Sequence, residues 1–412
     1  RALASATPSV CPEPAQQPLP SRQSWLSLYP DKEPGEGTHS RITVDSALVL
    51  QHGTAAWAQT EEAPPPVGDV ALRVPAETPE EQLLDVGLAL FDPGVPEDKS
   101  SHSKLGIFPE IRKSEAQFMA VILRQNLVDT GAWGVVRVLP EPDQTTELLV
   151  TGAILRSDGR VLHLRIAAQD ATGRLWLDRE YLDEAGEADY PVAPGRDPVG
   201  DLARAVANDL LLAREQLDTE ALATIREVAR LRYAATLSPE AFAGYLGRDA
   251  AGLYRLQRLP AEGDPMMDRV RRIRNQEYLF IDTLDENYAD LYQSMAPTYN
   301  LWRQYRREQA VYSEDYRQRV AGRDSRGPRG SYAAMEQTYE AYKWSKIHEQ
   351  DLDELALGFN NEVTPTVLEV KGKVFRLTGT LDAQYSEWRA ILREIFALET
   401  GMTAASGDDG VP

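Results

Sequence analysis

The fold of this chain is decided by residues 147–181, which read ELLVTGAILRSDGRVLHLRIAAQDATGRLWLDREY. Apolar and polar residues alternate along three stretches, and a period of two is typical of β-strands. The three stretches are 147–155, 161–169 and 174–181. Residues 157–160 (SDGR) and 170–173 (DATG) separate them and favour tight turns. The segment therefore predicts a meander of three antiparallel strands.

The residues around the meander complete one predicted domain. Residues 84–91 alternate as a mostly buried strand, and a helix with a wide apolar face follows over 113–130, with Gly131 placed to end it. A short strand is predicted over 135–139. After the meander, Asp197-Pro198 is predicted to open another helix as cap and first-turn proline. We expect a compact α+β domain over residues 81–216, with residues 96–104 as a surface loop.

The segment before this domain is rich in proline. Proline fixes φ and lacks a backbone donor, so residues 1–80 are predicted to be an extended arm. Residues 41–50 nevertheless alternate like a strand, and Trp25, Leu26 and Tyr29 are apolar groups that disordered linkers rarely keep. We therefore expect the arm to lie across the folded body or across a partner.

The segment after the domain changes to helical periodicity, and residues 217–400 predict a largely α-helical domain. A helix over 218–237 is followed by a short one at Ser238-Pro239-Glu240. A long helix over about 267–320 carries a heptad-like seam, which Pro297 should kink or split. Further expectations are a loop over 322–330, a helix over 331–357, a short β-hairpin near 366–379, a helix over 381–401 and a disordered tail over 401–412.

Composition narrows the class of protein. The 412 residues carry a formal net charge of −20, which disfavours nucleic acid and anionic lipid as partners. No apolar run approaches the ~20 residues that span a bilayer, so we expect no transmembrane segment. Cys11 is the single cysteine, and the chain begins Arg-Ala-Leu-Ala without methionine. Either a signal segment has been removed or the start of the chain has been trimmed. We expect an exported protein, and a lipidated cysteine ahead of Arg1 is compatible with this start.

Catalytic and metal-binding signatures are absent from the sequence. His348-Glu349 lacks the second histidine that a zinc protease motif requires, because Leu352 stands in its place. The five histidines are scattered, and the acidic cluster Asp282, Asp285 and Glu286 fits the charged flank of a helix seam better than a metal site. We predict no catalytic residue, no cofactor and no metal. The basic residues within 269–274 (RVRRIR) are expected to pair with acidic groups of the same chain.

Aromatic residues are dense in the helical half, and tyrosine suits surfaces that bury area while keeping a polar tip hydrated. They predict either a helical core or a face that binds protein or glycan. The candidate interaction surface comprises Tyr288, Tyr292, Tyr299, Trp302, Tyr305, Tyr312, Tyr339, Tyr342 and Trp344.

The order of elements over residues 83–216 resembles a family of bacterial envelope proteins. The matching features are the strand over 84–91, the helix over 116–128, the meander over 148–176 and the helix after Asp197-Pro198. The family includes the curli-secretion lipoprotein CsgG, the exopolysaccharide lipoprotein PelC and the amino-terminal domain of TolB. The resemblance implies a periplasmic, outer-membrane-associated assembly protein. It covers about a third of the chain, includes no membrane-spanning hairpins and supplies no functional residues.

Three functional hypotheses follow. The first is a non-enzymatic accessory or scaffold protein of an envelope complex, which contacts other envelope proteins and self-associates. The second is a hydrolase of cell-wall or polysaccharide material, which needs two carboxylates ~5–10 Å apart across a cleft. The third is a soluble periplasmic protein that binds a small ligand in a closed apolar pocket between the two halves.

Overall fold

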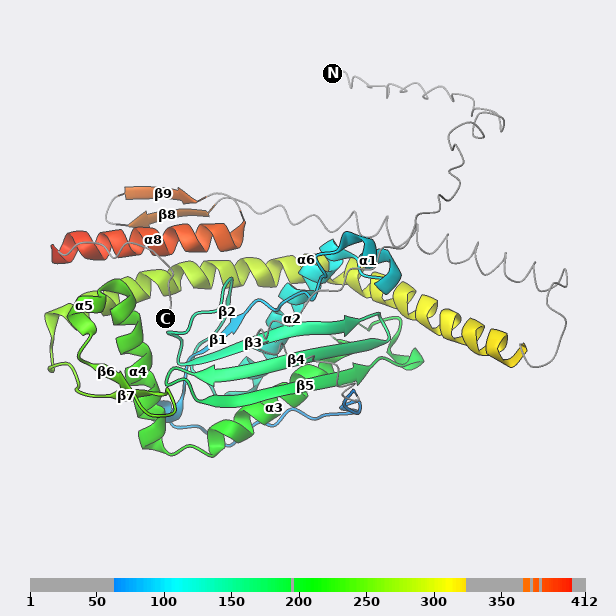
Figure 1. Cartoon of the computed structure of the whole chain (residues 1–412), viewed down its shortest axis with the longest axis horizontal. Coiled ribbons are helices and arrows are strands. Elements are labelled where there is room, and N and C mark those ends of the chain that lie inside the picture. Colours follow the sequence, from blue (N-terminus) through cyan, green and yellow to red (C-terminus); the bar gives the residue numbers. More distant parts are fainter. Residues whose placement is uncertain (1–62, 194–195, 324–365, 371–372, 378–379, 402–412) are drawn as a thin grey trace, which may run out of the picture. The chain divides into compact units, whose positions relative to one another are not determined.

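The computed structural model describes residues 63–193, 196–323, 366–370, 373–377 and 380–401 (Figure 1). These residues belong to one compact unit, residues 61–412. The predicted strand over 41–50, the helix over 331–357 and the tail after residue 401 lie outside the described residues. The predicted α+β class is confirmed, since a five-stranded mixed sheet is combined with long helices.

The sheet has the strand order β2-β1-β3-β4-β5. Its strands are β1 Val86–Ala89, β2 Val136–Leu139, β3 Leu148–Ser157, β4 Val161–Asp170 and β5 Leu175–Glu184. The pairs β3–β4 and β4–β5 are antiparallel, so the predicted meander is confirmed. Its two turns contain Gly159 and Gly173 at φ +79° and +91°, a region that glycine enters without steric cost.

Strand β1 is buried along its whole length and lies between two parallel neighbours, β2 on one side and β3 on the other. The connection over residues 140–147 must therefore cross β1, and it does so without a helix. Gly87 lies beneath it, and a Cβ there would come within 2.6 Å of Leu139 Cδ1 and 2.9 Å of Thr146 Cγ2. The missing side chain lets the crossover pass close to the strand.

Two helices pack on one face of the sheet. They are α2 Pro109–Thr130, which ends at Gly131 in the left-handed conformation as predicted, and α3 Gly200–Glu215. Helix α3 begins at Gly200 rather than directly after Asp197, whose carboxylate instead accepts a hydrogen bond from the Val199 N–H. The predicted loop over 96–104 is also wrong, because α1 Lys99–Leu105 forms there with Asp98 accepting the Ser100 N–H.

The helical half follows in chain order. It contains α4 Thr219–Leu237, α5 Pro239–Phe242, β6 Leu246–Arg248, β7 Tyr254–Leu256, α6 Pro265–Arg323, β8 Thr366–Val370, β9 Lys373–Leu377 and α8 Leu381–Thr400. Of two short 3₁₀ turns, Glu80–Gln82 precedes β1 and Glu187–Asp189 lies between β5 and α3. The helices predicted to begin near 218, 238, 267 and 381 and the β8–β9 hairpin are confirmed, whereas β6–β7 was not predicted. No helix among the described residues combines the length and apolar character that crossing a membrane requires.

Helix α6 runs the length of the sheet and beyond it, from green to yellow in Figure 1. Pro297 lies inside it without dividing it, so the predicted split does not occur. Buried Tyr299 and Trp302 hold the turn after the proline against α2 and residues around Phe108. Tertiary packing thus outweighs the ~3 kcal/mol that an internal proline costs a helix.

Helix α6 also closes the free edge of the sheet. Asp285 accepts the outward-facing N–H of Val138 in β2 at 3.2 Å, and Asp282 pairs with Arg137 at 2.6 Å. Edge strands with unpaired backbone groups invite aggregation, and this contact removes the hazard. Residues of the sheet and of α6 belong to one hydrophobic core. The boundary predicted at residue 216 therefore divides segments that share a core.

The described end of the proline-rich arm lies on the folded body, as expected. The Val67 N–H donates to the Leu182 carbonyl at the edge of β5, and the Val70 N–H donates to Asp201. Further along, Arg214 donates to the Gln82 carbonyl. These contacts tie residues 63–82 along α3.

Candidate functional site

Several aromatic residues of α6 are part of the hydrophobic core. Tyr288, Tyr299 and Trp302 are at most 2 % exposed, while Tyr292, Tyr305 and Tyr312 are half-buried. Phe118 of α2 packs edge-on against Tyr292 and Tyr299 at 5.2 Å between ring centroids. The core interpretation, left open by the sequence, holds for Tyr288, Tyr299 and Trp302, and Tyr292 and Tyr305 pack against that core. Tyr339, Tyr342 and Trp344 lie outside the described residues.

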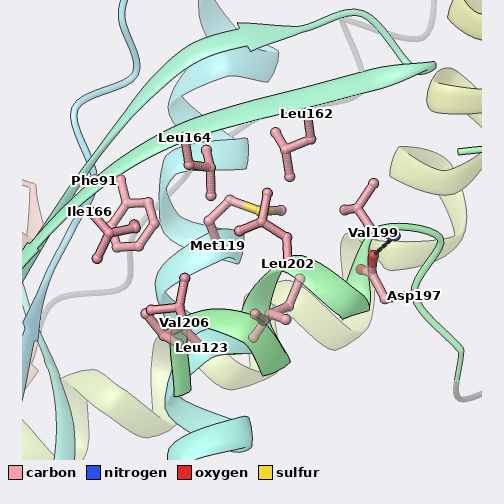
Figure 2. A pocket seen from close by; sticks show the side chains of 12 residues that line it. Phe91, Met119, Leu123, Leu162, Leu164, Ile166, Asp197, Val199, Leu202 and Val206 are labelled. Carbon is pink, nitrogen blue, oxygen red and sulfur yellow. Dashed lines mark hydrogen bonds between the residues drawn. The ribbon is translucent and has the colours of Figure 1, made fainter. Parts of the chain in front are cut away.

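A closed apolar cavity lies between the sheet, α2 and α3 (Figure 2). Figure 2 shows Leu164 of β4, Met119 of α2 and Leu202 of α3 pointing toward one another around it. Its volume is about 10 Å³, at the lower limit for one water molecule, ~10–15 Å³. It lies within the α+β half and is a packing gap of the core. It does not supply the closed ligand pocket of the third hypothesis.

A larger, open groove lies between α2 and α6, and we call it the α2–α6 groove. Its volume is about 900 Å³. Residues 121–126 of α2 form one wall and residues 289–304 of α6 the other. Residues 191–193 and the beginning of α3 at Gly200 close one end.

Side-chain amides dominate the polar lining of this groove. They are Gln125, Asn126, Gln293, Asn300 and Gln304. Those of Gln293 and Asn300 form no hydrogen bond with any described residue. Pro297, which also lines the groove, has no N–H to offer the Gln293 carbonyl four residues earlier. The α6 wall thus presents both donors and acceptors that the fold itself leaves unused.

Charged groups in the groove are largely compensated. Arg124 pairs with Asp285 at 2.6 Å, Arg204 with Asp201 at 2.8 Å, and Asp197 with Arg303 at 3.4 Å. Burial raises the pKa of Tyr292 to about 12, so its phenol stays neutral. Asp197 is the one carboxylate among the described lining residues. The groove therefore lacks the carboxylate pair that the hydrolase hypothesis requires and suits an uncharged hydrogen-bonding ligand.

Behind the α6 wall lies a buried polar group that we call the Glu115 cluster: Arg112, Glu115, Ser157 and Tyr299. Glu115 is fully buried and accepts hydrogen bonds from Ser157 Oγ at 2.5 Å and Tyr299 Oη at 3.0 Å. Arg112 Nε lies 3.1 Å from its second oxygen. The cluster fixes α6 to α2 and to the β3–β4 turn directly beside Asn300.

A second buried group, the Arg274 cluster, consists of Asp143, Arg274, Glu277 and Arg389. Arg274 lies 3.2 Å from Asp143 and 3.5 Å from Glu277, and Arg389 lies 3.4 Å from Glu277. Burial alone would raise the pKa of Asp143, but the two arginines and the hydrogen bonds from Thr145 lower it to about 2. The cluster joins the crossover loop to α6 and α8.

The basic and acidic stretches of α6 pair within the chain. Arg271 binds Asp268 at 2.7 Å and Arg272 binds Glu399 at 3.1 Å, while Arg274 is the centre of its cluster. This agrees with the expected internal pairing for these three arginines, whereas Arg269 forms no ion pair with a described residue. Asp282 and Asp285 bind arginines as described above. Among the described residues, no group of three or more His, Cys, Asp or Glu could hold a metal ion.

The groove amides were missed by sequence reasoning. Gln293, Pro297, Asn300 and Gln304 recur every three or four residues, so they share one face of α6, adjacent to the aromatic seam. That periodicity was a usable signal. The sequence contains no such signal for the wall formed by α2, because the packing of α2 against α6 depends on contacts between residues that are distant in sequence.

No protein-family model matches this chain, and comparisons with curated proteins and with solved structures likewise return no match.

Proposed function

We propose that this chain is a non-enzymatic accessory protein of a bacterial envelope assembly that holds an extended segment of a partner protein in the α2–α6 groove. The observation that carries the proposal is the α6 wall. Its unused side-chain amides at Gln293 and Asn300 lie along one open groove.

An extended peptide is the occupant whose chemistry fits best. A peptide backbone presents one N–H donor and one C=O acceptor per residue, without charge. Asparagine and glutamine side chains both donate and accept, so they match either group. The compensated arginines and Asp197 leave little net charge to select an ionic ligand.

The proposed envelope location is supported not by the groove but by the order of helices and strands from β1 to α3. That order resembles the domain of CsgG, PelC and the TolB amino-terminal part. Periplasmic residence, association with the outer membrane through a lipid anchor or a partner, and self-association belong to this proposal. A soluble monomer that captures no envelope component would count against it.

Site-specific photo-crosslinking in cells tests the groove directly. A photoreactive residue at position 293 should yield a defined crosslinked product, and mass spectrometry should map it to one linear segment of one partner. The control position is Lys113, exposed on α2 outside the groove lining. Identical products from both positions, or only products with the chain itself at scattered sites, would remove the proposal.

A groove-filling variant complements the crosslinking. Asn300→Trp should abolish the product from position 293 while leaving the circular dichroism spectrum unchanged. Unchanged crosslinking in this folded variant would show that the partner contacts the exposed helix surface and not the groove.

A further inference from the structure

The β6–β7 hairpin is attached to the turn between β4 and β5. The Tyr254 N–H donates to the Thr172 carbonyl at 2.8 Å. Arg232 of α4 donates to the neighbouring Ala171 carbonyl, also at 2.8 Å. These contacts give a short two-stranded hairpin a fixed position on the body.

Three arginines are stacked on the two tyrosines of this hairpin. The guanidinium carbons of Arg232 and Arg248 lie 4.5 and 4.6 Å from the Tyr254 ring centroid, and that of Arg258 lies 4.1 Å from the Tyr245 centroid. Arg248 also donates to the Tyr254 hydroxyl at 2.8 Å. Stacking holds the planar guanidinium groups in place and leaves their N–H edges available. We call these five residues the hairpin patch.

The hairpin patch carries uncompensated positive charge. None of its three arginines forms an ion pair with a carboxylate of the described residues. The neighbouring Arg255, by contrast, is neutralised by Asp249 at 2.9 Å. In a chain of net charge −20, acidic groups are abundant, yet among the described residues none lies within ion-pair distance of these three arginines. Leu259, next to Arg258, is 62 % exposed and adds an apolar contact.

We propose that the hairpin patch is a second docking surface, which binds a carboxylate-rich segment of a partner protein. Arg248 and Arg258 would each engage a carboxylate through two parallel N–H donors, the geometry that guanidinium groups favour. Leu259 would contact an apolar side chain within that segment. The surface is separate from the α2–α6 groove, so this proposal stands or falls independently of it.

An anionic lipid surface is the less favourable occupant. Three arginines attract an anionic membrane only weakly, whereas the whole-chain charge of −20 opposes approach to a surface of the same sign. A flexible acidic segment avoids this repulsion, because it can contact the three arginines without bringing an extended anionic surface close to the rest of the negatively charged molecule.

The test measures fluorescence anisotropy of a labelled peptide with repeating Glu-Glu-Leu units, using the full chain at low salt. We expect saturable binding that weakens with salt. Arg248→Ala with Arg258→Ala should weaken it by about tenfold or more. Arg165→Ala is the control, because it removes an exposed arginine that already pairs with Asp178, and it should change affinity less than about twofold.

Further arms separate the alternatives. Arg248→Lys with Arg258→Lys retains charge but loses the planar donor pair, and we expect intermediate affinity. Wild-type affinity in that lysine variant, equal loss in the Arg165→Ala control, or no peptide binding would overturn the proposal. So would binding to phosphatidylglycerol vesicles or to inorganic phosphate that exceeds binding to the peptide. Light scattering without peptide measures whether a second copy of the chain is the acidic partner. Dimers that disappear when Arg248 and Arg258 are replaced would likewise overturn the proposal.

Discussion

The Arg274 cluster and the Glu115 cluster fasten the same helix, α6, to the rest of the fold, but they are built differently. The Arg274 cluster pairs two arginines with two carboxylates and joins segments more than 100 residues apart. In the Glu115 cluster, one carboxylate is shared by an arginine and two hydroxyl groups. Only the Glu115 cluster lies beside the α2–α6 groove.

We therefore expect the first half of α6 to serve the stability of the fold and the second half to serve binding in the α2–α6 groove. The first half of α6 is held by charges whose removal leaves a partner buried without compensation. The second half is held by the hydroxyl donors of the Glu115 cluster and by the pair between buried Arg303 and Asp197 at 3.4 Å. Close packing adds to this at Gly159, where a Cβ would lie 2.7 Å from the Arg307 backbone nitrogen. We infer that the Arg274 cluster maintains the fold, while the Glu115 cluster positions the wall of the groove.

The largest expected effect is at the Arg274 cluster. Arg274→Met leaves Asp143 and Glu277 buried with Arg389 as the one remaining cation of the cluster, and we expect a loss of about 3–5 kcal/mol in the free energy of unfolding. Urea denaturation at pH 7 measures it. Lys113→Ala, which breaks the exposed Lys113–Glu110 pair, is the control and should cost less than about 0.5 kcal/mol. A loss below about 1 kcal/mol for Arg274→Met would mean that the cluster does not carry the first half of α6.

The second effect is a pH dependence beside the Arg274 cluster. Burial raises the pKa of Glu147 to about 7, and the nearby Asp85 carboxylate contributes a smaller rise. The hydrogen bond from the Asp85 N–H acts in the opposite direction and lowers this pKa. Between its unfolded pKa of 4.5 and 7, the folded state binds more protons, so the free energy of unfolding falls as pH rises.

Glu147→Gln tests this sign. The variant should gain about 1–3 kcal/mol of stability relative to the wild type between pH 4 and pH 8. Parallel denaturation at both pH values measures that difference, and the subtraction cancels other groups such as Asp183, whose pKa burial raises to about 6. A pH-independent difference between variant and wild type would contradict the prediction.

The third prediction concerns two tyrosine hydroxyl groups, one in contact with each cluster. Tyr385 Oη donates to Glu277 and Tyr299 Oη donates to Glu115, each at 3.0 Å. We expect Tyr385→Phe and Tyr299→Phe to cost about 1–2 kcal/mol each, because each leaves a buried carboxylate one donor short. Only Tyr299→Phe should also reduce crosslinking from position 293. If both variants reduced crosslinking equally, the Glu115 cluster would not be the one that specifically positions the wall of the groove.

The smallest expected effect on stability is in the groove itself. Asn300→Ala and Gln293→Ala remove amides that bind no described residue, so each should change the free energy of unfolding by less than about 0.5 kcal/mol. Crosslinking from position 293, where the photoreactive residue already replaces Gln293, should nevertheless weaken when Asn300→Ala is added. A destabilisation comparable to that of Tyr299→Phe would show that these amides serve the fold.

Short-range patterns in the sequence determined the elements and many of their ends. Alternation predicted β3, β4 and β5, glycines at 159 and 173 marked their turns, and Gly131 and Asp218 marked helix ends. These features depend on backbone sterics and on hydrogen bonds within a few residues, so one chain segment contains the whole cause. The α+β class of the fold followed from the same patterns.

Tertiary structure alone decided the burial of Tyr288 and Tyr299, the continuity of α6 at Pro297 and the hairpin β6–β7. It also decided both clusters and the groove, since Arg274 meets Asp143 and Tyr299 meets Glu115 across more than 100 residues. The free energy of such contacts depends on which helix faces approach one another. A tyrosine seam on α6 is equally consistent with a docking face or a core until α2 is placed against it.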